Sequence, residues 1–379
     1  MKPLSSSIRG RAGRTAVFGL VALLVGGCYD YEKRIQWSPD GQRAAILTTE
    51  GLFLSDAKGR LSRNLSPKAN AVAWLSDSQR LAVVTYDSTG VRLAIARING
   101  EELTAGPSLY SDSTAVLDIR IAPGDAHLAF TIENESDAAD LLVAPCDGSA
   151  PPAVVSQRAA AFPDWSPDGR ALVYFKGGGK SDEASLGTLV RRGVVNENGK
   201  VELSREPVHL AGVLIFPLAH APQVRCLKDG RVVFNAAEFD LPLAPDDIEG
   251  TREQLFAVET ARQPTLVRLM TRQAQQELPT SLRFEVSPDE RQVLFGTPEG
   301  SVHVLTLATG KVQEVQPSAE EKGKMDVAVT PVWRRAGQFT YVKRLSSGDR
   351  PAEVILREGE QEIVLSKDWS SEFIKQLVR

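Results

Sequence analysis

Few residues of this chain have the types and spacings that catalysis requires. The sequence contains no Gly-x-Ser-x-Gly, His-Glu-x-x-His or Cys-x-x-Cys motif and no EF-type calcium loop. Residues 177–181, Gly-Gly-Gly-Lys-Ser, end like a phosphate-binding loop, but the first glycine of that motif belongs at position 174, which is Tyr. We therefore interpret this segment as a loop between strands, and we predict neither an enzyme nor a bound cofactor or metal.

The four histidines stand alone, and each lies far from the others in the sequence. They are His127, His209, His220 and His303. The first and last lie in or beside runs that are expected to be strands, and His209 lies near a strand end, so we predict structural or surface roles. The role of His220 is the hardest to assign, because it precedes an expected inner strand.

One insertion combines apolar residues with carboxylates and is our candidate partner-binding loop, residues 239–250. Its candidate contact residues are Phe239, Asp240, Asp246, Asp247 and Glu249. Extra length on a repeat scaffold usually emerges on one face and often carries binding. Shorter segments at 177–185 and 133–137 invite the same interpretation, and the alternative for all three is a solvated loop.

The amino terminus has the composition of a signal peptide. The basic residues of the first fourteen positions are Lys2, Arg9, Arg11 and Arg14. Residues 15–27 carry no charge and, as a helix, would reach about 20 Å, which is short of a hydrocarbon core of roughly 30 Å. We predict a signal peptide over residues 1–27.

The end of this segment indicates a lipid anchor. Val25-Gly26-Gly27-Cys28 resembles the bacterial lipobox, which implies a lipidated Cys28 as the mature amino terminus and residues 28–30 as a tether. Anchoring by more than one acyl chain is stable. The alternative is an ordinary secretory signal. In enteric bacteria, the inner-membrane retention signal resembles an Asp directly after the lipidated cysteine, and this chain has Tyr29 at that position. We therefore expect the protein at the outer membrane facing the periplasm, or at the cell surface, within the bacterial envelope.

Composition narrows the class of protein and of partner. The 379 residues include 30 Gly, 3 Cys and 42% hydrophobic residues, which excludes collagen-like, disulfide-stapled and disordered chains. The formal net charge is −4, and it becomes more negative once the four basic residues of the leader are removed. An acidic chain without a basic tract argues against nucleic acid as a partner.

A short segment recurs along the chain and reveals its organisation. Trp37-Ser38-Pro39-Asp40-Gly41 reappears unchanged at residues 165–169. Weaker copies begin at Trp74, Ile121, Cys226, Val286 and Trp333. The onsets recur at intervals of roughly 40 to 60 residues, and this period suits one four-stranded blade per repeat.

The segment has the chemistry of a tight turn inside a hairpin. Pro fixes φ, Asp bonds back to the backbone, and Gly supplies a positive φ. The bulky first residue ends a strand and is placed to cover the neighbouring unit. The residues that we assign to this motif are Trp37, Pro39, Asp40, Gly41, Trp74, Asp77, Trp165, Pro167, Asp168, Gly169, Asp229, Gly230, Pro288, Asp289 and Trp333.

Trp-Ser-Pro-Asp-Gly followed by an apolar strand resembles the repeats of TolB-type, WD-repeat-like β-propellers. The resemblance covers residues 31–367 and implies an all-β chain with seven four-stranded blades, six being the alternative. TolB carries a separate domain before its blades, and the short spacer after Cys28 leaves no room for one, so its partners are not carried over.

Two expectations depend on this arrangement. Cys146 and Cys226 fall in units that are not adjacent, so we predict free thiols, the alternative being a disulfide in an oxidising compartment. In the tail, residues 368–379, Phe373, Ile374 and Leu377 follow Ser370 at helical spacing. We predict a short helix packed under the ring, and the alternative is a frayed end.

We therefore expect a monomeric, membrane-anchored propeller that serves as a non-catalytic interaction platform for other envelope proteins. The alternative is a propeller enzyme or a small-ligand-binding protein that uses the central channel. Charged residues on the innermost strands would favour this alternative. The sequence indicates mainly small apolar residues there, as at residues 71–73 and 159–161.

Overall fold

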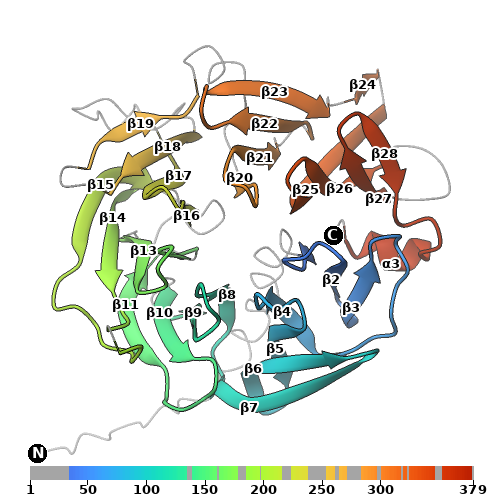
Figure 1. The fold of residues 1–379 in the computed structure, drawn as a ribbon. Helices are drawn as coiled ribbons and strands as arrows, with labels where there is room; N and C mark the ends of the chain where they lie inside the picture. Colours follow the sequence, from blue (N-terminus) through green and yellow to red (C-terminus); the bar gives the residue numbers. More distant parts are fainter. Residues whose placement is uncertain are drawn as a thin grey trace, which may run out of the picture.

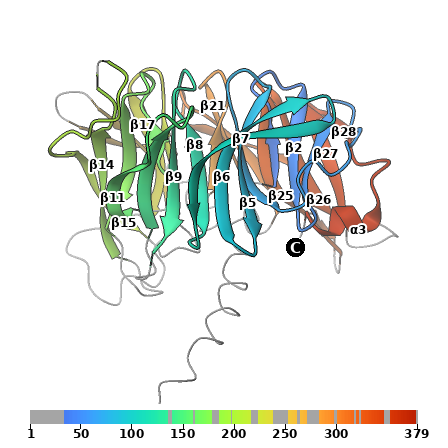
Figure 2. The same ribbon diagram turned by 90° about the horizontal axis from the view of Figure 1, so that it is seen from below.

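The strands group into seven antiparallel blades arranged in a ring (Figure 1), with three strands in blade one and a sheet of four main strands in each of the others. The computed structural model describes residues 34–134, 139–159, 162–177, 185–196, 198–215, 223–237, 253–260, 264–270, 283–296, 300–316, 319–321, 324–345 and 352–377. Each repeat of the sequence motif begins one blade, so the predicted fold and the number of seven are confirmed. Seen from the side, the strands run roughly along the ring axis (Figure 2).

Residues 34–159 form the first three blades. Blade one contains β1 (Ile35–Trp37), β2 (Arg43–Thr48) and β3 (Gly51–Asp56). Blade two contains β4 (Ala69–Trp74), β5 (Arg80–Asp87), β6 (Gly90–Asn99) and β7 (Glu102–Asp112). Blade three contains β8 (Val116–Ile121), β9 (His127–Glu133), β10 (Ala139–Pro145) and β11 (Ala153–Ala159). The expected fourth strand of blade one at residues 61–65 is reduced to isolated bridges at Leu61 and Ser66.

Blades four and five follow with the same order of strands. Blade four contains β12 (Asp164–Trp165), β13 (Ala171–Lys176), β14 (Ser185–Gly193) and β15 (Val208–Ile215). Blade five contains β16 (Val224–Cys226), β17 (Arg231–Ala237), β18 (Glu253–Glu259) and β19 (Leu266–Arg268). Residues 159–161 were expected on an innermost strand, but Ala159 ends β11, the outermost strand of blade three.

The last two blades and one helix complete the ring. Blade six contains β20 (Arg283–Val286), β21 (Gln292–Gly296), β22 (Val302–Thr306) and β23 (Lys311–Gln316). Blade seven contains β25 (Lys324–Arg335), β26 (Gln338–Arg344), β27 (Ala352–Glu358) and β28 (Gln361–Val364), with β24 (Ala319–Glu321) paired to β25. The helix is α3 (Ser371–Lys375).

The hydrophobic core is divided among the interfaces between neighbouring blades. At one interface, Val84 and Leu93 of blade two pack with Phe130 of blade three. At another, the ring of Phe175 meets that of Phe234 edge-on, with centroids 5.7 Å apart. A small four-stranded sheet cannot bury both of its faces alone, and radial stacking supplies each face with a partner.

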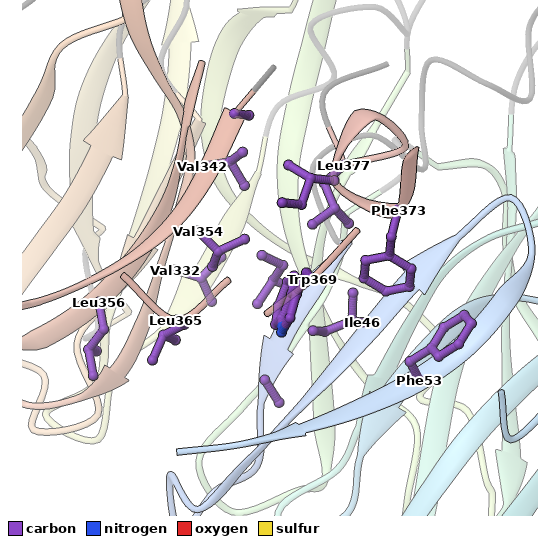
Figure 3. Close-up of a cluster of buried hydrophobic side chains, with 14 of the residues drawn as sticks. Ile46, Phe53, Val332, Val342, Val354, Leu356, Leu365, Trp369, Phe373 and Leu377 are labelled. Carbon is purple, nitrogen blue, oxygen red and sulfur yellow. The ribbon is translucent and has the colours of Figure 1, made fainter. Parts of the chain in front are cut away.

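The ring closes by packing between blades one and seven, as expected, and the described strands of these two blades belong to separate sheets. Ile46 and Phe53 of blade one meet Val342 and Val354 of blade seven in one cluster (Figure 3). The tail adds Trp369, whose indole Nε1 donates to the carbonyl oxygen of Gly59 at 2.6 Å.

The predicted C-terminal helix is confirmed, and its position is now defined. The Ser370 hydroxyl accepts from the backbone N–H of Phe373, which caps the amino end of α3. Phe373, Ile374 and Leu377 are buried in the same cluster, and the helix lies at one rim of the ring (Figure 2). It stabilises the seam between the first and last blades.

Candidate functional site

In blades one, two, four and seven, the tryptophan of the motif hydrogen-bonds to the preceding blade. Trp74 Nε1 donates to the carbonyl oxygen of Gln36 at 2.9 Å, and Trp165 Nε1 donates to that of Arg120 at 3.0 Å. Trp333 makes the same bond to Glu285, at 3.0 Å. At the seam, Trp37 donates instead to Thr340 Oγ1 at 3.0 Å. These indoles therefore have structural roles.

The remaining motif residues build identical turns. Ser38 Oγ donates to Asp40 Oδ1 at 2.6 Å, and Ser287 Oγ donates to Asp289 Oδ1 at 2.6 Å. The latter bond lowers the pKa of Asp289. The same bond joins Ser166 to Asp168 at 2.5 Å, while Asp77 and Asp229 pair with arginines of their own turns. Pro39, Pro167 and Pro288 occupy the second position of these turns.

The fourth position of the turn has a positive φ, and it links neighbouring blades in a way that sequence reasoning missed. Gly41, Gly169 and Gly230 have φ values of 65°, 67° and 89°. Ser78, Asp125 and Glu290 occupy the same position in other blades, with φ values of 56°, 61° and 58°.

The three side chains bond to the turn of the preceding blade. Ser78 Oγ accepts from the backbone N–H of Asp40, Asp125 from that of Ser76, and Glu290 from that of Lys228. At Gly169 an added Cβ would lie 3.0 Å from the carbonyl oxygen of Pro123 in blade three. The sequence does carry a signal for these links, because three copies of the motif have Ser78, Asp125 or Glu290 where the others have glycine.

The three histidines of the described chain lie in different blades. His127 and His303 are buried, in blades three and six, and burial lowers the pKa of each. His303 Nε2 lies 2.8 Å from Ser301 Oγ and stacks on Phe295, while His209 is exposed on β15. His220 lies outside the described residues.

The two cysteines of the described chain are free thiols, as predicted, in blades three and five. Burial raises the pKa of the Cys146 thiol to about 12, and that of Cys226 is raised for the same reason. A thiol of such high pKa is a weak nucleophile at neutral pH.

Several predicted sites lie wholly or partly outside the described residues. These are Cys28 and the leader, the candidate partner-binding loop at 239–250, most of the 177–185 segment and residues 135–137. The partner-binding loop belongs to the connection between β17 and β18, so it is part of blade five.

The structure corrects the expectation of an apolar centre. The residue before the bulky first residue of each motif lies on the innermost strand, and we call these seven positions the axis ring. Its members are Gln36, Ala73, Arg120, Asp164, Arg225, Glu285 and Val332. Four consecutive blades, three to six, therefore place charges of alternating sign at one level of the ring.

The two acids of the axis ring hold the edge of the next blade. Asp164 Oδ2 accepts from the backbone N–H of Cys226 at 2.8 Å, and Glu285 Oε2 accepts from that of Trp333 at 3.1 Å. A similar bond involves Gln223, two residues before Arg225: its Oε1 accepts from the backbone N–H of Phe284 in blade six at 3.2 Å. Innermost strands are edge strands with unpaired backbone groups, so these side chains satisfy donors that would otherwise be unpaired.

The two guanidiniums are enclosed near these acids. Arg120 Nε donates to Asp118 Oδ2 at 3.0 Å on the same strand. Burial lowers the pKa of both arginines, that of Arg225 to about 10, while the charges of Asp164 and Glu285 raise both. Groups from four blades thus interact electrostatically at the centre of the ring.

Two further features bear on the chemistry of the chain. Within the described ranges, no three His, Cys, Asp or Glu side chains gather as a metal ion would require. No helix in that part of the chain is both long and apolar enough to cross a membrane.

Comparison with known proteins identifies the fold. A puromycin-hydrolyzing peptidase of Mycobacterium tuberculosis is 12% identical with a TM-score of 0.58, over 89% of this chain and 54% of that one. The Cps50 (Swd1) β-propeller domain of Myceliophteria thermophila is 11% identical with a TM-score of 0.54, over 86% and 97%. TolB from Acinetobacter baumannii is 15% identical with a TM-score of 0.46, over 86% and 76%.

These similarities extend to the fold alone. The chain spans about half the length of the peptidase, and its neighbours include peptidases as well as a protein described only as a propeller domain. No protein-family model matches the sequence, and a search of curated proteins finds no significant match. The shared architecture and the seven repeats identify this chain as a seven-bladed β-propeller.

Proposed function

We propose that the protein is a lipid-anchored propeller of the bacterial envelope, facing the periplasm, that binds another envelope protein without catalysis. The lipobox-like sequence ending at Cys28 supports the anchor. The observation that carries the binding role is an exposed apolar edge on blade five, beside the candidate partner-binding loop in sequence.

The outermost strand of blade five has the features of a docking edge. Leu266 and Val267 on β19 are 48% and 46% exposed, and among the described strands none pairs with the outer side of β19. A cleft of about 320 Å³ adjoins it. Its lining includes Arg231, Val267, Arg268, Leu269, Met270 and Leu307. An edge strand beside an apolar cleft with a charged margin can accept an extended segment of a partner.

The described residues favour binding over catalysis. The pair that most resembles a nucleophile and its base, Ser301 and His303, is 7% and 6% exposed. A hydrolytic nucleophile must reach its substrate, and this serine is enclosed within blade six. The half-buried thiols of Cys146 and Cys226, whose pKa is raised, are equally unsuited to that role.

Cross-linking in the native host tests the docking edge. The full-length protein with Leu266→Lys and Val267→Lys should lose its cross-linked partner, because two charges would replace the apolar contact. Val208→Lys, at a residue that is 57% exposed on β15 of blade four, is the matched control and should retain the partner. A partner that is lost equally with both variants, or with neither, contradicts the proposed surface.

Metabolic labelling with a fatty-acid analogue tests the anchor separately. The wild-type chain should carry the label and fractionate with membranes, whereas Cys28→Ala should lose both properties. Labelling that persists in Cys28→Ala, or its absence from the wild type, contradicts the lipid anchor and leaves the docking test intact.

A further inference from the structure

The first described residue of the chain, Arg34, is fixed to one face of the ring. Its carbonyl oxygen accepts from the backbone N–H of Leu47 at 2.8 Å, and its Nη1 donates to the carbonyl oxygen of Gln376. Gln376 Oε1 in turn accepts from the backbone N–H of Thr49 at 3.1 Å, and its Nε2 donates to Glu50 Oε1 at 2.8 Å. The start of β1, the turn between β2 and β3 and the end of the C-terminal segment therefore meet at one place.

This place lies on the face opposite the motif turns. Successive strands of an antiparallel blade run in opposite directions, so each motif turn lies at one face and the next hairpin turn at the other. Neighbouring motif turns contact each other, as where Ser78 Oγ accepts from the backbone N–H of Asp40. We call the face with the motif turns the motif face, and the face with Arg34, Thr49 and Glu50 the anchor face.

The connection from Cys28 to the ring is too short to reach the motif face. Arg34 follows Cys28 by six positions, so this connection spans at most about 21 Å. The height of β2, six residues or about 20 Å, takes up this reach, and passing outside β3 adds roughly 10 Å. A lipid on Cys28 therefore cannot hold the motif face against a bilayer.

We propose that the anchor face lies toward the lipid bilayer and the motif face toward the aqueous compartment. This inference rests on the proposed lipid anchor at Cys28. Arg34 precedes the innermost strand of blade one, so the chain joins the ring near the middle of the anchor face and draws that face toward the bilayer. The acidic chain offers no electrostatic attraction to anionic lipid, so the length of the connection sets the orientation.

The docking edge on blade five then faces away from the bilayer. Its cleft is bounded by Arg231 at the start of β17, Glu259 at the end of β18 and Thr309 in the turn between β22 and β23. All three positions are at the motif-face ends of their strands, and blades five and six lie across the ring from blade one (Figure 1). A partner embedded in the same bilayer must therefore extend at least about 20 Å beyond it to bind there.

Energy transfer to a labelled lipid tests the orientation. The lipidated full-length protein is added to phospholipid vesicles that carry an acceptor dye, and a donor dye is attached to one introduced cysteine. Ser88→Cys places the donor in the turn between β5 and β6 on the anchor face, and Ala336→Cys places it in the motif turn of blade seven. Both residues are exposed, and their blades flank blade one.

Transfer from position 88 should exceed that from position 336 at least about twofold, because roughly 20 Å separates the two faces. The wild type measures the background from Cys146 and Cys226, whose raised pKa slows their labelling. Cys28→Ala, combined with each introduced cysteine, removes the lipid and should abolish transfer from both positions.

A longer connection tests whether its length sets the orientation. Inserting about twenty Gly and Ser residues after Asp30 extends the reach beyond the distance to either face, so the difference between the two positions should disappear. A difference that persists would show that the anchor face itself adheres to lipid, and would contradict the length of the connection as the cause.

The remaining outcomes distinguish this inference from the proposed function. Equal transfer from the two positions, or stronger transfer from position 336, in a protein that carries lipid overturns the orientation and leaves the lipid anchor intact. A wild-type chain without lipid overturns the anchor and the orientation together. Neither result affects the cross-linking test of the docking edge.

Discussion

The two arcs of the axis ring share a backbone but differ in chemistry. Blades seven, one and two place Val332, Gln36 and Ala73 there, whereas blades three to six place Arg120, Asp164, Arg225 and Glu285. We call these the neutral arc and the charged arc.

The contacts that secure the arcs differ as well. The neutral arc contains the seam, which apolar side chains and the C-terminal helix hold together (Figure 3). In the charged arc, carboxylates join the inner edges of blades four to five and six to seven. Stability of the ring should therefore depend on apolar packing in the neutral arc and on hydrogen bonds to carboxylates in the charged arc.

The largest expected effect is at the seam. Trp369→Ala removes a buried indole and its bond to Gly59, and should lower the free energy of unfolding by about 3–5 kcal/mol. Trp369→Phe keeps most of the packing and should cost about half as much or less. Urea unfolding measures both, and a loss below about 1 kcal/mol for the alanine variant would show that the neutral arc does not depend on this residue.

The next effect is on the charged arc. Asp164→Ala leaves the N–H of Cys226 without its acceptor and should cost about 1–3 kcal/mol. Asp164→Asn retains an acceptor oxygen and should cost less in urea unfolding. If the two variants are equally destabilised, the hydrogen bond to blade five is not what the carboxylate contributes.

Acid should destabilise the charged arc through its buried histidines. Burial lowers the pKa of His303 and His127 below the ordinary 6.5, so the unfolded chain binds protons first as pH falls. The stability that neutral histidine contributes is present above pH 6.5 and is lost as pH falls toward the folded pKa, by up to about 1.4 kcal/mol per pH unit for each residue.

Unfolding between pH 7 and pH 5 measures this loss. His303→Gln should flatten the dependence, whereas His209→Gln, at an exposed histidine, should leave it unchanged. A slope that His303→Gln leaves intact would assign the acid sensitivity to other groups.

The smallest expected effect is at Arg225 in the charged arc. Arg225→Met should change the free energy of unfolding by less than about 1 kcal/mol, because the lost bond to Val224 is offset by relief of the desolvation cost. Urea unfolding measures this change. A loss above about 2 kcal/mol would make Arg225 a structural residue like those of the neutral arc.

Much of the fold could be predicted because its signals are local. Trp37 to Gly41 and its copies specify a turn by the φ preferences of Pro and Gly and by the side-chain bond of Asp40. The short helix could likewise be predicted from the capping residue Ser370 and the helical spacing of Phe373 and Leu377. In contrast, Trp369 was overlooked, since its partner Gly59 is 310 positions away in sequence.

The candidate site was harder to predict for the same reason. Arg120, Asp164 and Arg225 each stand beside a motif onset, but single charges on strands are usually solvated, and nothing in their local sequence distinguishes them. The positive-φ residues Asp125 and Glu290 were also missed, because a bond to the preceding blade can be recognised only once the blades are stacked.

The repeat, the turn chemistry and hence the shape of a blade follow from local sequence, because they depend on residues within a few positions of one another. Which side chains meet at the axis depends on the closed ring, since closure brings together residues from blades that are distant along the chain. Charge becomes a site only when such residues face one another in a poorly solvated space, where the attraction and the cost of burial are both large.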